Sequence, residues 1–321
     1  MKHLKPALIH LKKPTAIATG IAILLLIVGE IRSPGFANFS QIINMLTVAA
    51  FLGFVAAGQN LVVLSGKGGI DLSVGKMVTL GAILGGTIAN GMDSGVILAF
   101  SVVVIVTFSI GILNGIGVTL IGIPPLIMTL SMGIIVESIS RFVTGGLLVK
   151  GATPIMSTIV TGRFLGIPGI IYIWIIFTVL VILFQKNTRF GMSLYTMGNN
   201  DQAARLSGLN VRWIRITTYG LSSMLAGLAG FFYLGYLGSI YNISLGNKYN
   251  LASVVAVVVG GVSLSGGKGG YLGVAVGCIL LQFLESFLTV QSIPSWGREV
   301  VMGITLLVLL TAYAREKKLK Q

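Results

Sequence analysis

The feature that most constrains this chain is a succession of long apolar stretches in which charged residues are almost absent. An α-helix needs about 20 predominantly apolar residues to cross the hydrocarbon core of a bilayer. Hydrophobic residues make up 55% of the chain and charged residues 9%, whereas about a quarter of the residues in soluble domains are charged. The sequence therefore predicts an all-α, polytopic integral membrane bundle, with residues 1–321 forming a single transmembrane domain.

About ten transmembrane helices are expected from these stretches. The third and the eighth are short or interrupted by glycine, so either of them could be a broken helix. Small residues four apart, such as Gly81 and Gly85, are typical of membrane helices that pack closely. The expected spans are residues 14–31, 43–64, 72–90, 95–120, 124–145, 168–185, 213–238, 250–263, 270–289 and 297–314.

The basic residues predict the orientation of the bundle, because Lys and Arg are enriched on the cytoplasmic side of membrane proteins. With ten spans and both termini cytoplasmic, 16 of the 22 Lys and Arg residues lie inside, three of them (Lys67, Lys76 and Lys268) assigned to short inner turns. Eight spans would give the same orientation. The residues left outside are Arg32, Arg141, Lys150, Arg163, Lys248 and Arg298.

The net charge of +14 does not indicate nucleic-acid binding in a chain of this kind. Basic residues at the ends of spans face anionic lipid headgroups, and aromatic and basic residues are not interleaved as in a nucleic-acid surface. The single cysteine, Cys278, lies in an apolar run, and His3 and His10 lie in the N-terminal tail. Neither a disulfide framework nor a metal site is expected, and no cofactor is predicted in this chain.

The inner loop at about 186–212 predicts a short helix at 200–207. Asn199 or Asn200 is suited to the N-cap, and Asp201 lies in the first turn, where the helix dipole favours an acid. Gly208 suits the position that ends a helix. Such a short helix needs packing to be stable. It either docks into a groove of another protein or rests on its own bundle or on lipid headgroups.

Five runs of the sequence, in order, resemble the permease subunits of ribose-type ABC importers, a family that also serves other simple sugars and autoinducer-2. The resemblance covers nearly the whole chain, including the inner loop. The run G-I-D-L-S-V-G favours this branch over the related permeases for branched-chain amino acids and nucleosides. The runs are Gly69–Gly75, Leu113–Gly115, Ile123–Leu130, Ala226–Gly230 and Val259–Leu264.

The resemblance implies a bacterial plasma (inner) membrane protein that spans the membrane several times. A second permease copy or a paralogue would pair with it, and an extracytoplasmic binding protein would deliver a sugar-like solute. Separate ABC ATPase subunits would bind ATP and Mg²⁺, and the inner helix would couple them to the spans. The coupling residues implied are Asn200, Asp201, Gln202, Ala203, Ala204, Arg205, Leu206, Ser207 and Gly208.

Two residues depart from the family's pattern. Lys76 stands where the family usually has a small residue, and Glu137 stands where it often has arginine. Arg141 lies four residues after Glu137 on the same helix face, so these two side chains are expected to pair. The departure puts any solute contact carried over to this span in doubt.

Polar residues inside the spans are candidates for the translocation pathway, because they are costly in the membrane and often functional. Interhelical hydrogen bonds are an equally good explanation for most of them. Asp71 is expected to cap the third span, and Gln282 and Glu285 either line an outer vestibule or reach the headgroups. The pathway candidates are Gln59, Asn60, Asn114, Thr129 and Glu137.

The glycine-rich segment 265–270 resembles both residues 65–69 and the L-S-G-G-Q signature of ABC ATPases. The first likeness indicates an internal repeat or chance. The second is rejected, because the chain lacks the phosphate loop that an ATPase requires. The chain is therefore not expected to be an enzyme. An ion-coupled secondary transporter is the alternative function, although the acidic residue at mid-span that it needs is not evident.

Overall fold

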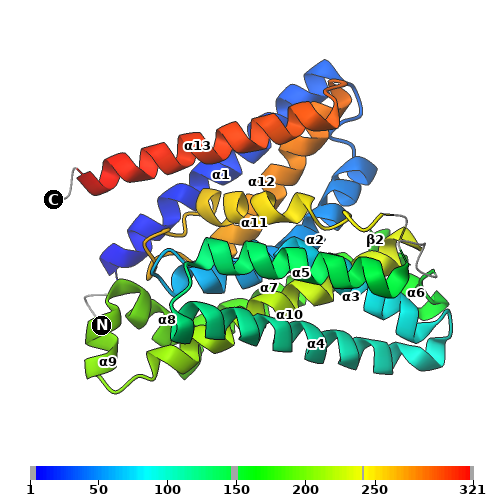
Figure 1. The fold of residues 1–321 in the computed structure, drawn as a ribbon. Helices are drawn as coiled ribbons and strands as arrows, with labels where there is room; N and C mark the ends of the chain where they lie inside the picture. Colours follow the sequence, from blue (N-terminus) through cyan, green and yellow to red (C-terminus); the bar gives the residue numbers. More distant parts are fainter. Residues whose placement is uncertain (1–4, 146–150, 241, 319–321) are drawn as a thin grey trace.

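The computed structural model describes residues 5–145, 151–240 and 242–318 and forms a helical bundle (Figure 1). His3 and Lys150 lie outside the described residues. A helix occupies each of the ten predicted positions. These helices are α1 (Lys5–Arg32), α2 (Phe39–Leu64), α3 (Val74–Ala89), α4 (Val96–Ile116), α5 (Pro125–Thr144), α7 (Gly169–Asn187), α10 (Val211–Leu237), α11 (Lys248–Val259), α12 (Tyr271–Val290) and α13 (Ser295–Lys318).

Seven segments of the described chain are long and apolar enough to cross a membrane, namely those of α1, α2, α4, α5, α7, α10 and α12. The third and eighth spans are shorter, as predicted, because α3 has 16 residues and α11 has 12. Each of these two helices follows non-helical backbone, residues 65–73 before α3 and residues 238–240 and 242–247 before α11. We refer to these two spans, each a short helix preceded by non-helical backbone, as the broken spans.

Shorter elements connect the spans. A 3₁₀ turn, η1 (Asp93–Gly95), precedes α4, and a π-helical turn, η2 (Gly117–Ile121), follows it. The connection between α5 and α7 contains α6 (Pro154–Thr161) and an antiparallel pair of strands, β1 (Arg163–Phe164) and β2 (Ile167–Pro168). The inner connection holds α8 (Arg189–Asn199) and α9 (Asp201–Leu206).

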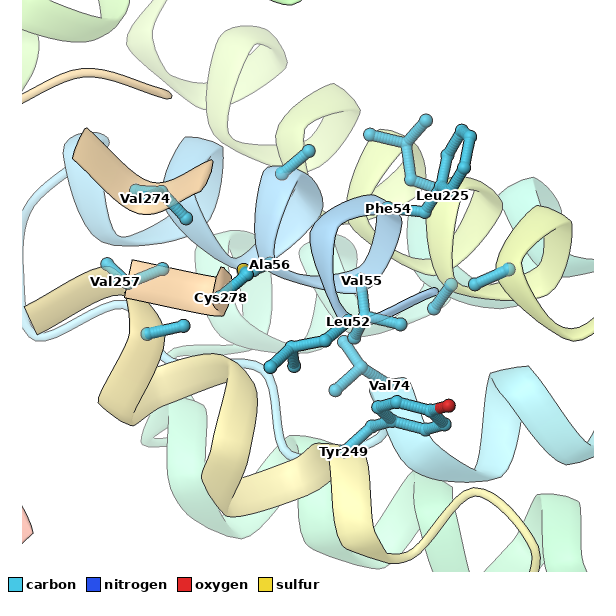
Figure 2. Close-up of a cluster of buried hydrophobic side chains, with 14 of the residues drawn as sticks. Leu52, Phe54, Val55, Ala56, Val74, Leu225, Tyr249, Val257, Val274 and Cys278 are labelled. Atoms are coloured by element: carbon cyan, nitrogen blue, oxygen red, sulfur yellow. The ribbon is translucent and has the colours of Figure 1, made fainter. Parts of the chain in front are cut away.

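The helices α2 and α10 are largely buried, and much of the surface of α1, α4 and α5 is exposed and apolar. This arrangement suits lipid, which needs no polar outer surface. The core joins side chains from α2, α3, α10, α11 and α12. Figure 2 shows part of this core, with Leu52 of α2, Val74 of α3 and Tyr249 of α11 close together.

The two broken spans meet at the N-terminal ends of their helices. The backbone N–H of Gly75, in α3, donates to Asn250 Oδ1 of α11 at 2.8 Å. In return, the N–H of Gly246, just before α11, donates to Thr79 Oγ1 of α3 at 3.1 Å. The N–H groups at a helix start have no partner within the helix. Each broken helix therefore supplies a side-chain acceptor to the other.

Glycines at the α3–α10 crossing predict a sharp sensitivity to added volume. A methyl group at Gly81 would clash with the backbone carbonyl of Gly227, whereas Gly20 in α1 has open space around it. We expect Gly81→Ala to lower the free energy of unfolding by about 1–3 kcal/mol, because the added methyl group overpacks the crossing. This loss outweighs the higher helix propensity of alanine compared with glycine. Thermal unfolding of the purified protein in mild detergent measures the effect.

The matched control is Gly20→Ala, which adds the same methyl group at an open position of a helix. It is expected to leave the unfolding midpoint unchanged or slightly raised. Equal midpoints for the two variants would contradict the close approach of α3 and α10.

Candidate functional site

The short inner helix forms where the sequence predicts it. In α9, the side chain of Asn200 accepts hydrogen bonds from the N–H groups of Gln202 and Ala203, both at 3.0 Å. Asn200 is therefore the N-cap, and Asn199 is instead the last residue of α8. Gly208 has φ +83°, the left-handed conformation that ends a helix at low cost for glycine.

Asp201 is the centre of an ion-pair network that holds α9 in place. Its carboxylate lies 2.7 Å from Arg215 Nη2, 3.0 Å from Lys67 Nζ and 3.1 Å from Arg205 Nη2. Arg215 is buried and also donates to the carbonyl of Ser65 at 3.3 Å. Burial of Asp201 raises its pKa, but the hydrogen bonds from Arg215 and Lys67 outweigh this, so the pKa is lowered overall. The ionised carboxylate thus links α9 to α10 and to the turn after α2.

Two glycine-rich turns, residues 65–69 and 265–270, lie against each other beneath α8. The N–H of Gly267 donates to the carbonyl of Leu64 at 3.0 Å. Gly198 sits between the two turns, and a Cβ at this position would clash with both Leu64 and Gly267. The segment that resembles an ATPase signature is therefore a packed turn, and the two similar segments are neighbours in space.

One face of α9 packs on the bundle and the other is open. Ala204 is fully buried and belongs to the main core. Gln202, Ala203 and Arg205 are exposed, and the Leu206 side chain is 84% exposed. The helix thus rests on its own bundle, as one alternative predicted, while it presents an apolar side chain ringed by polar ones at the inner surface.

The backbone of the broken third span binds two of the predicted pathway residues. The N–H of Asp71 donates to Gln59 Oε1 at 3.3 Å, and the N–H of Leu72 donates to Thr129 Oγ1 at 3.1 Å. Gln59 belongs to α2 and Thr129 to α5. Both side chains are fully buried and replace the helical hydrogen bonds that this segment lacks.

The carboxylate of Asp71 joins a third pathway candidate to the same segment. Asp71 accepts hydrogen bonds from the N–H and hydroxyl of Ser73, at 3.0 and 2.5 Å, and from the hydroxyl of Ser222 at 2.9 Å. Asn114 Nδ2 donates to Ser73 Oγ at 3.0 Å. The N-cap of α3 is Ser73, so the prediction that Asp71 caps this helix was wrong. Asp71 instead closes the buried turn before it.

Several polar atoms near this segment have no partner within the described chain. They belong to the fourth candidate, Asn60, whose side chain has neither a donor nor an acceptor nearby, and to Gln59 Nε2 and Asn114 Oδ1. Unpaired buried polar groups are rare and call for water, an ion or movement. The role of these residues in translocation stays a prediction.

The two departures from the family pattern pair with each other. Lys76 lies in the first turn of α3, not in an inner turn as counted from the sequence, and its ammonium group contacts the Glu137 carboxylate. Arg141 completes the group, with its Nη2 2.7 Å from Glu137 Oε1, as the spacing predicted. Both Lys76 and Glu137 are mostly buried. This pair joins α3 to α5 apart from the Asp71 turn.

Comparison with known proteins places the chain in a protein family. Residues 41–310 match the family described as branched-chain amino acid transport system / permease component. The chain belongs to this family. The ribose import permease protein RbsC of Escherichia coli K12 is 32% identical to the permease over 90% of each chain. The corresponding protein of Bacillus subtilis 168 is 34% identical, over 90% of this chain and 89% of its own.

A third relative carries a different sugar in its name. The fructose import permease protein FruF of Bifidobacterium longum is 30% identical, over 85% of the permease and 77% of its own chain. The resemblance to sugar permeases of ABC importers is thus confirmed. No solved structure matches the permease.

Sequence reasoning missed three residues of these clusters, namely Lys67 and Arg215 beside Asp201 and Ser222 beside Asp71. A signal was present for Arg215, because an arginine at the start of an apolar span needs a partner. No signal was present for Ser222, since a serine hydroxyl in a membrane helix commonly hydrogen-bonds to the backbone of its own helix.

The network at Asp201 predicts unequal costs for its members. Asp201→Asn leaves the buried Arg215 without a counter-ion, which is costly. We expect a loss of about 1–3 kcal/mol in the free energy of unfolding, because the pair is partly exposed to water. Arg205→Gln is the control, since the Arg205 side chain is 47% exposed and is expected to contribute less than about 1 kcal/mol. Unfolding curves of the purified protein in detergent measure both losses. Equal losses in stability for Asp201→Asn and Arg205→Gln would argue against the network.

The Lys76–Glu137 pair predicts a strong coupling between two helices. Glu137→Leu or Lys76→Met alone leaves one mostly buried charge unpaired, whereas the double variant removes both. We expect each single change to destabilise the permease and the double change to cost less than their sum, with a coupling energy of about 1–3 kcal/mol. A double-mutant cycle on thermal stability measures it, and additive losses would show that the pair is not formed.

Proposed function

We propose that the permease is the membrane-spanning subunit of an ATP-driven importer for a sugar-like solute, in a bacterial plasma membrane. It pairs with a second permease, identical or paralogous, and receives solute from an extracytoplasmic binding protein. Separate ABC ATPase subunits bind ATP and Mg²⁺ and carry out the hydrolysis. The import permeases for ribose and fructose among its relatives support this proposal.

The observation that carries the proposal is the open face of α9. An exposed leucine ringed by polar residues is the composition of a small protein–protein contact, and Leu206 with Gln202 and Arg205 has this composition. We assign residues 200–208 as the contact with the ATPase subunit. An ion-coupled secondary transporter would leave this face, and the network that anchors it, without a role.

The anchoring of α9 offers a route for the motion. A push on α9 acts through Asp201 on Arg215, in the first turns of α10, and on Lys67, in the turn that leads to the broken third span. The helix α10 packs along α2, α3 and α4. Closure of the ATPase subunits would therefore move these elements together as a rigid body.

Purification from the native host tests the assembly. We expect the permease, extracted in mild detergent, to carry with it a protein that has both a phosphate loop and an L-S-G-G-Q signature, identified by mass spectrometry. If the permease purifies alone and still moves solute in liposomes down a proton or sodium gradient, secondary transport replaces the importer.

Gly208 predicts a separation of transport from folding. At φ +83° a β-branched residue is strained, although no atom lies near enough to obstruct a side chain. We expect Gly208→Val to shift α9, abolish solute uptake and uncouple ATP hydrolysis, while the bundle keeps its melting temperature within a few degrees. Uptake and ATPase activity of the assembled complex in liposomes measure this.

The control variant is Gly208→Asn, because asparagine tolerates the left-handed conformation. It should retain most of the uptake. Normal uptake by Gly208→Val would remove the coupling role from this segment.

A further inference from the structure

A cavity of about 480 Å³ opens between α2, α11, α12 and α13, toward their outer ends. One of its walls is formed by α11, which is short. Its 12 residues span about 18 Å, whereas the hydrocarbon core of a bilayer is about 30 Å thick. The outer part of this span is therefore not filled by helix, and α13 covers the space from the side. The cavity is separate from the α9 contact and from the Asp71 turn.

The deeper wall of the cavity is apolar. Leu52 of α2, Ala252 of α11, Leu281 of α12 and Met302 of α13 contribute to it. Polar side chains, Asn247, Gln282 and Ser295, line other parts of the cavity, but a polyhydroxyl solute against the apolar wall would leave hydroxyl groups without partners. An alkyl chain fits the same wall and has no such groups to pair.

Four charged side chains, two of each sign, also line the cavity. They are Lys248, Glu285, Arg298 and Glu299. For Glu285, the sequence allowed two locations, an outer vestibule or the lipid headgroups. Among the described residues, no ion pair joins any of the four. Opposite charges that share a cavity without pairing leave both signs open to a ligand.

The hydrogen bonds of the two cations support this reading. The Lys248 ammonium donates to the hydroxyl of Tyr233 at 3.1 Å and lies 5.1 Å from the ring centroids of Tyr233 and Tyr249. Arg298 Nη1 donates to Thr289 Oγ1 at 2.8 Å. Both cations are thus positioned by neutral groups and keep their charge uncompensated.

The depth of the cavity matches the lipid interface. Trp296, in the first turn of α13, is 70% exposed, and tryptophan gathers at the headgroup level of membranes. Arg298 and Glu299 lie only two and three residues further along the same helix. Arg298 and Glu299 are therefore at the level of lipid headgroups, whereas Lys248, the first residue of the short α11, lies nearer the apolar wall.

We propose that this cavity binds one zwitterionic phospholipid, with its headgroup at the four charged side chains and an acyl chain along the apolar wall. Lys248 and Arg298 bind the phosphate, and Glu285 and Glu299 bind the ammonium group. The lipid fills the space that the short α11 leaves and supports α13 against the bundle. The binding does not depend on which solute the permease carries.

Native mass spectrometry of the permease in mild detergent tests the proposal, with phosphatidylethanolamine and phosphatidylglycerol offered in equal amounts. We expect one phosphatidylethanolamine to be retained per chain, and phosphatidylglycerol, which has no ammonium group, to bind about tenfold more weakly. Arg298→Gln should weaken the retention about tenfold, because hydrogen bonds to charged groups are strong. Equal retention of the two lipids by the unaltered permease overturns the zwitterionic assignment.

Two further variants separate binding from folding. Arg298→Lys keeps the charge and should retain the lipid better than Arg298→Gln does, at a similar melting temperature. Arg163→Gln removes an outer arginine that does not line the cavity and should leave retention unchanged. If both Gln variants behave alike, or if ribose displaces the lipid while glycerophosphoethanolamine does not, the cavity is not a lipid site.

Discussion

The structure depends on one requirement of the membrane interior, that every backbone polar group finds a partner within the protein. Regular helices meet it by themselves, but the two broken spans do not. At the start of α3 the missing partners are side chains from three other segments, Gln59, Thr129 and Asn250. The polar residues of this apolar chain are thus gathered where helical hydrogen bonding fails.

This requirement also connects the inner surface to the centre of the bundle. The turn after α2 holds Lys67, which pairs with Asp201, and leads within four residues to the buried Asp71. The segment between them begins in a turn and is rich in glycine, and it is held at both ends by hydrogen bonds or ion pairs. If α9 couples the ATPase subunits to the bundle, as proposed, its displacement would reach the broken span through the chain itself as well as through α10.

The sequence was sufficient to predict where the helices lie, but it did not predict which charged side chains pair between them. The apolar stretches located ten helices, seven of which lie in segments long and apolar enough to cross a membrane, and capping preferences located α9, because both are local properties. Glycine interruptions identified the broken spans. The pairings of Asp201 with Lys67 and of Lys76 with Glu137 could not be predicted, since only the packing of distant segments brings these side chains together. The buried Asp71 turn was misassigned as a cap for the same reason.

The Lys76–Glu137 pair has a consequence for how such permeases diverge. The resemblance to ribose-type permeases leads us to expect a small residue at the first position and arginine at the second in the relatives. A Glu137→Arg change alone would leave Lys76 beside two arginine-type charges, with Arg141 one turn away. We therefore expect the two positions to be exchanged together, so that a chimera that receives α5 from a relative with arginine at this position would fold best with the first turn of that relative's α3.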